Sequence, residues 1–243
     1  GAKATNIDVH NETVRSVHVA QPDYDRLLQF HCAYVLDATE LGDLLPLADI
    51  PYVFGAESKD DTGEPHARPE GPDPQLVHPF SFPLALDFCP GQDHTIAKPQ
   101  NYEYYRDNQP FTTALHWDGQ AHHFGFCKTT NRSPGALRAH HRIFAADNFV
   151  DAERDLTVVN WPCNAYRTSH PIDDPSAQQL ALRQAKELSL GILYWLQTEI
   201  PRDDGSGRGY PELRLRGDVM GTDDGLSQHP YVRESRRIIA RKT

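Results

Sequence analysis

Two asparagines and two aromatic side chains between residues 160 and 166 have the chemistry of a substrate pocket. Asn160 and Asn164 carry amide groups that can donate hydrogen bonds to a substrate carbonyl, and Trp161 and Tyr166 can stack on a ligand or wall a pocket. The β-branched run Leu156–Val159 predicts a strand that ends at this cluster. Capping of that strand end without any ligand is the alternative interpretation. We expect Asn160 to take part in catalysis and Trp161, Asn164 and Tyr166 to contact substrate.

A second candidate site follows the apolar segment Tyr34–Leu36. A continuous apolar run is typical of a parallel strand buried on both faces, and ligands of parallel sheets bind beyond the carboxyl ends of the strands. Small residues there let the backbone approach a bulky ligand closely. Many structural strand-to-turn joints share this pattern, so spacing alone assigns no ligand. The candidate ligand-binding residues are Asp37, Ala38, Thr39, Gly42 and Asp43.

A family resemblance extends this interpretation. The segment 34–48 resembles the flavin-contacting turn of glutathione-reductase- and fumarate-reductase-like flavoproteins, although Glu40 stands where that turn has glycine. Further blocks, in order and across nearly the whole chain, are similar to one branch, the FAD-dependent oxidoreductases of the FAD_oxidored type. These blocks are Thr62–His66, Asn160–Asn164, Leu188–Glu199, Gly209–Arg216 and Pro230–Ile238.

The resemblance implies an enzyme that uses FAD and transfers hydride between the flavin and a small organic substrate. It implies that the candidate turn residues 37–43 lie near the cofactor. Flavoproteins of this kind open with a strand and a G-x-G-x-x-G turn that seats the pyrophosphate on a helix N-terminus, and this chain starts without them. We therefore interpret the chain as an internal fragment whose partners are the missing N-terminal and C-terminal segments of the same protein, and the activity of the fragment by itself stays open.

Acid–base and charged groups are predicted less directly, because no acid–base pair stands at a diagnostic spacing. His66 and Tyr210 are the candidates for proton transfer. Arg233 or Arg236 is a candidate for contacting substrate, because on a helix Arg233, Arg236 and Arg237 would share one side and converge on a carboxylate or on flavin phosphates. A solvated face balanced by nearby acidic residues is the alternative.

The sequence does not favour a metal site. Adjacent residues on a strand point to opposite faces, so neither His122–His123 nor His140–His141 can chelate one ion without outside ligands. The four cysteines, at 32, 89, 127 and 163, are far apart, which is typical of reduced thiols and favours a cytoplasmic location. The loop Gly205–Gly209 imitates a dinucleotide-binding turn, but it follows a helix and has Tyr210 in place of the third glycine.

Composition limits the partners. The 243 residues carry a net charge of -10, from 24 Lys and Arg against 34 Asp and Glu, which argues against nonspecific nucleic-acid binding. No apolar run approaches the roughly 20 residues of a membrane helix, so we expect a small-molecule substrate and no membrane partner. Whether the parent protein carries a signal peptide stays an open question. Walker A, G-x-S-x-G, H-E-x-x-H and C-x-x-C patterns do not occur in the sequence.

We expect a mixed α/β (α+β) fold to position these motifs. It would combine the C-terminal part of a Rossmann-like FAD domain with a β-rich cap or substrate domain that also contains helices. We place residues 1–50 in the FAD domain, 51–230 in the cap and 231–243 at the return to the FAD domain. The expected elements are a β-meander over 6–36, a long loop over 57–74 that covers the flavin or merely connects, a half-buried antiparallel edge strand over 80–88, a hairpin around Asp118–Gly119 and a helix from Asp174–Pro175 to Glu199.

Two other functions fit the sequence without a flavin. A polysaccharide-active or carbohydrate-binding protein would stack sugars on exposed aromatics, with a Tyr, His and Arg set for elimination chemistry. A noncatalytic cap or interaction module is the third hypothesis, because the phosphate-binding turn is absent. The aromatic residues considered for sugar stacking are Tyr102, Tyr104, Tyr105, Trp117 and Trp161.

Overall fold

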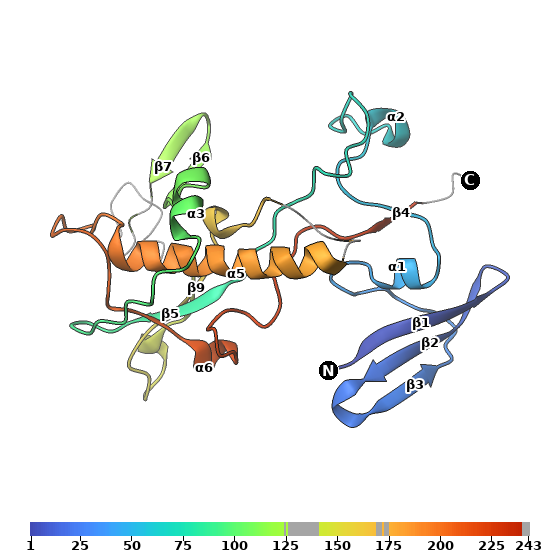
Figure 1. Cartoon of the computed structure of the whole chain (residues 1–243), viewed down its shortest axis with the longest axis horizontal. Coiled ribbons are helices and arrows are strands. Elements are labelled where there is room, and N and C mark those ends of the chain that lie inside the picture. Colours follow the sequence, from blue (N-terminus) through green and yellow to red (C-terminus); the bar gives the residue numbers. More distant parts are fainter. Residues whose placement is uncertain (124, 126–140, 169–171, 173–174, 240–243) are drawn as a thin grey trace. The chain divides into compact units, whose positions relative to one another are not determined.

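The computed structural model describes residues 1–123, 125, 141–168, 172 and 175–239. The chain divides into two compact units, one made of Gly1–His78 with Val232–Thr243 and the other of Pro79–Tyr231, here called unit 1 and unit 2. The first boundary thus falls at 78/79, whereas the sequence suggested 50/51. Both helices and open sheets are present, which confirms the mixed α/β class (Figure 1).

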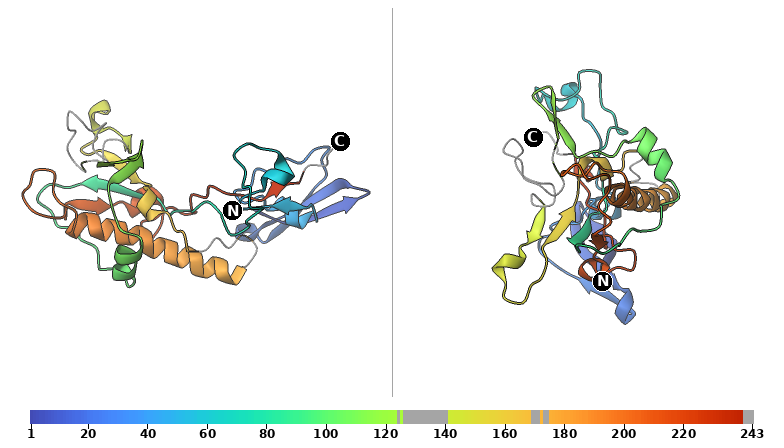
Figure 2. Two further views of the ribbon diagram at one scale, coloured as in Figure 1. Left: turned by 90° about the horizontal axis from the view of Figure 1, so that it is seen from above. Right: turned by 90° about the vertical axis from the view of Figure 1, so that its left-hand side faces the viewer.

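Unit 1 begins with the predicted β-meander. Strands β1 (Lys3–His10), β2 (Thr13–Gln21) and β3 (Arg26–Phe30) pair antiparallel in that order, with the one-turn helix η1 (Pro22–Tyr24) between β2 and β3 (Figures 1 and 2). Ile7 and Val17 of the meander pack with Ala48, which follows the short helix α1 (Leu44–Leu47). The small core of unit 1 therefore lies between the meander and the α1 turn.

The buried strand expected at Tyr34–Leu36 is wrong. This segment is neither helix nor strand, and Tyr34 and Leu36 are 89% and 90% exposed. A strand buried on both faces lies inside a sheet that other elements cover above and below, and no strand that the structure describes pairs with this segment. Only Val35, which packs against the unit 1 core, points inward.

The helix on which Arg233, Arg236 and Arg237 would share one side does not form. The strand β11 (Arg237–Ile238) pairs antiparallel with β4 (Tyr52–Val53), and the backbone N–H of Arg236 donates to the Leu41 carbonyl at 3.2 Å. These cross-chain bonds use backbone groups that a helix would need internally. The predicted long loop follows β4 in the first segment of unit 1. It contains a single helical turn, α2 (Lys59–Thr62), capped by Ser58.

Unit 2 contains a four-stranded antiparallel sheet in the order β10-β5-β9-β8. The edge position and half-burial expected for the strand at 80–88 are wrong, because β5 has partners on both sides and Leu84 to Asp87 are all buried. Pro83 precedes the first ladder pair and so removes no ladder hydrogen bond. The strands are β5 (Leu84–Phe88), β8 (Arg142–Phe144), β9 (Leu156–Val159) and β10 (Leu213–Leu215).

The long helix α5 (Pro175–Thr198) organises unit 2, and its prediction is confirmed. A stripe at helical spacing is wholly buried, including Ala181, Ala185, Leu188 and Leu196. The shorter helix α3 (Tyr102–Asn108) packs against α5, as Figures 1 and 2 show. The expected N-cap Asp174 lies outside the described residues.

The predicted hairpin is present as β6 (Ala114–Trp117) and β7 (Gln120–His123). Asp118 and Gly119 have φ values of +50° and +76°, as a two-residue turn of this kind requires. Phe126, Cys127 and His140 lie outside the described residues. The remaining elements are the helix α6 (Gly217–Met220) and the single turns η2 (Ala146–Asn148) and η3 (Pro162–Asn164).

Candidate functional site

A pocket of about 390 Å³ in unit 1 gathers most of the residues predicted to bind the cofactor. Asp37, Thr39 and Gly42 lie on its wall, together with Ser235 and Arg236. The rest of the lining is apolar and comes from the meander, from the segment before the turn, from the α1 region and from β11: Ile7, Val14, Val35, Leu44, Leu45, Ala48, Ile50 and Ile238. A mostly apolar pocket with a few polar groups at one side has the composition of a cofactor or ligand site.

Asp37 holds the turn together. Its carboxylate accepts hydrogen bonds from the Thr39 backbone N–H at 3.0 Å, from the Thr39 hydroxyl at 2.7 Å and from the Leu44 N–H at 3.0 Å. The Thr39 hydroxyl in turn accepts from the Asp43 N–H at 2.6 Å. The side chains of Asp37 and Thr39, both predicted from the sequence, therefore hold the backbone of the turn that forms this part of the pocket wall.

Arg236 braces the same turn from the other end of the chain. Its side chain is 7% exposed and donates to the Leu41 carbonyl at 2.9 Å and to Asp43 at 3.2 Å. Gly42 lies between these contacts with φ of +67°, and a Cβ there would be 3.0 Å from the Arg236 carbonyl oxygen. Glycine is thus required at 42 by backbone conformation and by the close passage of residue 236.

The other unit 1 candidates lie away from the pocket wall. Ala38 is an exposed member of the turn, His66 is exposed in the loop after α2, and Arg233 is exposed before β11. None of the three is among the residues that line the pocket. Their assignment to cofactor binding or catalysis stays a prediction.

The cluster at 160–166 joins β9 to α5 inside unit 2. Asn164 is wholly buried, accepts the Trp161 N–H at 2.8 Å and donates to the Phe82 carbonyl and to Ser189 at 3.4 Å each. Tyr166, 2% exposed, donates to Gln184 of α5 at 2.5 Å. Asn160 accepts a hydrogen bond from the Ser81 hydroxyl at 2.7 Å. These bonds position a strand end, and contact of the cluster with substrate stays a prediction.

Tyr210 is also buried in unit 2, with 3% of its surface exposed. Its hydroxyl accepts the Asp203 backbone N–H at 2.8 Å, and the Arg202 guanidinium stacks over its ring at 4.5 Å. These contacts close the loop after α5. A role for Tyr210 in proton transfer stays a prediction.

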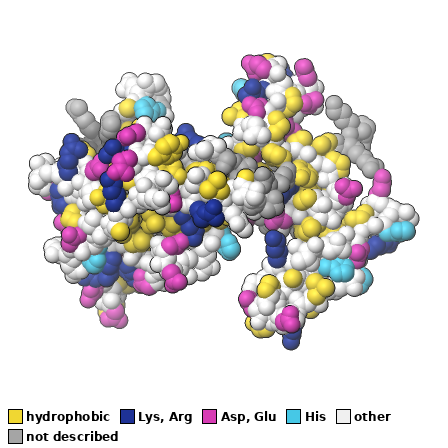
Figure 3. Space-filling view, in the orientation of Figure 1, with side chains coloured by type: hydrophobic (Ala, Val, Ile, Leu, Met, Phe, Trp, Pro, Cys, Tyr) yellow, Lys and Arg dark blue, Asp and Glu magenta, His cyan; other side chains and the backbone are white. Residues whose placement is uncertain are grey.

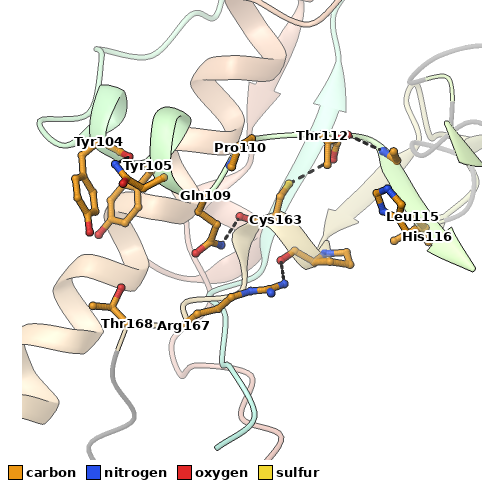
Figure 4. Close-up of a pocket in the computed structure, with 13 residues that line it drawn as sticks. Tyr104, Tyr105, Gln109, Pro110, Thr112, Leu115, His116, Cys163, Arg167 and Thr168 are labelled. Atoms are coloured by element: carbon orange, nitrogen blue, oxygen red, sulfur yellow. Dashed lines mark hydrogen bonds between the residues drawn. The ribbon is translucent and has the colours of Figure 1, made fainter. Parts of the chain in front are cut away.

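Sequence reasoning missed a larger pocket of about 650 Å³ in unit 2 (Figure 4). In Figure 4, Tyr104 and Tyr105 of α3 lie on one side and Leu115 and His116 of β6 on the other. Gln109, Cys163 and Arg167 lie between them. Tyr104 and Tyr105, which the sequence suggested for sugar stacking, were not connected there with Arg167, which directly follows the cluster at 160–166.

Neither the thiol nor the buried phenol of this pocket titrates near neutral pH. Burial raises the pKa of Cys163 to about 12, and its Sγ donates to the Thr112 carbonyl at 3.4 Å. Burial also raises the pKa of Tyr105, whose hydroxyl donates to the Gln184 carbonyl at 3.1 Å. Both groups stay protonated, so the pocket offers no thiolate nucleophile and no phenolate base.

A comparison with protein families settles the class of the protein. The model of the family described as FAD dependent oxidoreductase matches residues 1–243, the whole chain. This chain belongs to the FAD dependent oxidoreductase family. The family is FAD-dependent, so the cofactor is FAD. No curated protein and no solved structure matches this family member significantly.

Two negative findings concern this FAD-dependent chain. No group of three or more His, Cys, Asp or Glu side chains among the described residues is arranged to hold a metal ion. Of the helices in the described ranges, none has the length and apolar character that crossing a membrane requires.

Proposed function

We propose that the chain acts in hydride transfer between a small organic substrate and FAD, and that the unit 1 pocket holds part of the FAD molecule. The single observation that carries the proposal is that Asp37, Thr39 and Gly42, chosen from sequence, line one pocket in a chain of an FAD-dependent family. The bound FAD would supply the hydride acceptor or donor. The protein's own residues bind the cofactor and the substrate, orient them and shield them from water.

The composition of the pocket fits one ring system of the cofactor with its polar edge. Val14, Val35 and Ile50 give apolar walls for a flat ring, while Thr39 and Ser235 offer hydroxyl groups and Arg236 a cation at one side. The volume of about 390 Å³ is smaller than a whole dinucleotide needs, so the pocket accounts for one part of FAD. The sequence holds no strand followed by G-x-G-x-x-G, so the pyrophosphate is left to other groups.

The candidate catalytic residues take defined roles in this proposal. Arg236, already bonded to Leu41 and Asp43, holds the turn in shape and contributes a fixed positive charge beside the pocket. Arg233 is the candidate for the substrate's charge, and His66 and Tyr210 for proton transfer. Asn160, Trp161, Asn164 and Tyr166 are proposed to shape the substrate-binding part, and Ala38 and Asp43 to contact the cofactor. A cytoplasmic location fits the scattered reduced cysteines.

The test is the visible absorption spectrum of the natural-length protein, followed by heat release and identification of the chromophore. We expect a flavin spectrum and released FAD. The pocket assignment is tested by Val14→Trp, which fills the pocket, against the control Leu27→Trp at an exposed position of β3 outside the pocket. Flavin content should fall at least about tenfold in the first variant and stay unchanged in the second. A colourless folded protein that takes up no added FAD would contradict the function, and equal flavin in both variants would contradict the pocket.

A further inference from the structure

Among the described residues, none that lines the pocket of unit 2 has an acidic side chain. None of the residues that line its 650 Å³ is Asp or Glu, although the chain carries 34 of them and they are scattered over the surface seen in Figure 3. The lining instead includes one arginine, Arg167, and one histidine, His116. In a chain of net charge -10, a large pocket of this kind is a local site for a negative charge.

Arg167 has no carboxylate partner among the described residues. Its one hydrogen bond is a long one, 3.4 Å, from Nη2 to the Pro162 carbonyl, and the side chain is exposed to the pocket and to solvent. Most arginines of unit 2 do have carboxylate partners there, so Arg167 differs from its neighbours. The paired arginines are Arg106, Arg142, Arg154, Arg202, Arg214 and Arg216.

The amide of Gln109 is held in one orientation. Its Nε2 donates to the carbonyls of Cys163 at 3.0 Å and Ala165 at 2.9 Å, which uses both N–H groups. The amide oxygen therefore points away from these carbonyls, as Figure 4 shows. The fixed amide oxygen of Gln109 is a hydrogen-bond acceptor and repels a carboxylate from its vicinity. Arg167 is then the charged group that a bound carboxylate contacts.

We infer that this pocket binds a small carboxylic acid with an apolar or aromatic body, its carboxylate on Arg167 and its body against the Tyr104 ring. The planar guanidinium matches a carboxylate with two parallel hydrogen bonds. Tyr104 is 56% exposed, so its ring is free to stack on a ligand, whereas Tyr105 is buried against α5. This binding site goes beyond the proposed function and does not depend on flavin.

The test is equilibrium binding of phenylacetate to the full chain, measured by calorimetry, with phenylacetamide as its neutral analogue of the same shape. We expect phenylacetate to bind at least about tenfold more tightly than phenylacetamide. Arg167→Met should weaken phenylacetate binding at least about tenfold and leave phenylacetamide unchanged. Arg183→Met, the same change at an exposed position of α5 outside the pocket, should leave both unchanged.

A second pair of variants keeps the test independent of Arg167. Thr168 is exposed and lines the pocket, so Thr168→Glu introduces a negative charge beside the site and Thr168→Gln a neutral group of the same size. Phenylacetate binding should weaken in Thr168→Glu but not in Thr168→Gln. The inference is overturned by no binding up to about 10 mM, by equal binding of acid and amide, or by equal effects within either pair of variants. Because flavin content is measured separately, failure here leaves the oxidoreductase proposal standing, and the reverse also holds.

Discussion

Asp87 is the most strongly paired carboxylate of unit 2. Its side chain is wholly buried, accepts hydrogen bonds from Arg214 Nε at 3.0 Å and Nη2 at 2.5 Å, and accepts one from Arg216 Nη1 at 2.9 Å. Burial alone would raise the pKa of Asp87, but the hydrogen bonds and charges of Arg214 and Arg216 together hold it below its usual value. These ion pairs link β5 to β10, an edge strand of the sheet.

Asp87→Asn should lower the free energy of unfolding of the protein by about 2–4 kcal/mol at neutral pH, because it leaves two guanidinium groups beside a buried neutral amide. Denaturant unfolding followed by circular dichroism measures the change. Asp218→Asn is the matched control, because Asp218 pairs with Arg216 but is exposed, and we expect little change there. Equal losses in both variants would show that burial of Asp87 is not what makes its pair stabilising.

The same pair predicts a pH dependence. Because the pKa of Asp87 is lower in the folded protein than in the unfolded chain, its contribution is complete above the unfolded value of roughly 4 and is lost as pH falls through the folded value. Wild type should therefore lose part of its stability below about pH 4 that Asp87→Asn no longer has to lose. The difference in unfolding free energy between the two proteins should shrink steadily as pH is lowered.

At the scale of elements, the loop after α5 uses two glycines with the same backbone conformation and different surroundings. Gly205 and Gly209 have φ of +73° and +75°. A Cβ at Gly209 would lie 2.2 Å from the Gln197 carbonyl oxygen, whereas a Cβ at Gly205 would meet nothing within 4 Å. This loop resembled a dinucleotide-binding turn in sequence, but its last glycine is there to let the chain pass the end of α5.

Gly209→Ala should therefore cost more than about 3 kcal/mol of stability and Gly205→Ala only about 1 kcal/mol, because both substitutions strain φ but only the first also meets backbone. Thermal unfolding of the two variants side by side makes the comparison. Equal shifts in the midpoint would mean that the end of α5 moves to make room, contrary to the packing seen at Gln197.

Prediction from sequence succeeded where the signal was local and failed where it depended on distant partners. The spacing of hydrophobic residues correctly predicted α5, and the dipeptide Asp118–Gly119 correctly predicted the hairpin, because each of these patterns acts within one segment. The strand at Tyr34–Leu36 was wrong, and the helical arrangement considered for the arginines at 233–237 is not formed, because both depend on which other segments pair with them. For the site, Asp37 and Thr39 were found by type and order, whereas the unit 2 pocket was missed because its walls come from separate segments.

At the scale of the whole chain, unit 2 is one continuous segment whose two ends are hydrogen-bonded to each other. Ser81 and Tyr231 exchange two backbone hydrogen bonds, Ser81 N–H to Tyr231 at 3.1 Å and Tyr231 N–H to Ser81 at 2.7 Å. Unit 1, by contrast, is made of two segments that come from either side of unit 2. A segment that enters and leaves at one place, with its own sheet and its own helical core, has the anatomy of an inserted domain.

Residues 79–231 should therefore fold on their own when expressed without unit 1. The buried residues of α5 and of the four-stranded sheet lie entirely within this segment, so excision exposes none of the bonds described for it. We expect cooperative thermal unfolding, with helical circular dichroism from α5 and a transition that matches one seen in the full chain. Ser81→Pro, which removes one of the two end-tying hydrogen bonds, should lower the midpoint in the excised segment, whereas Ser227→Ala, which removes only an exposed side-chain bond near the exit, should change it little. An excised segment that stays unfolded would show that unit 1 contributes to its core.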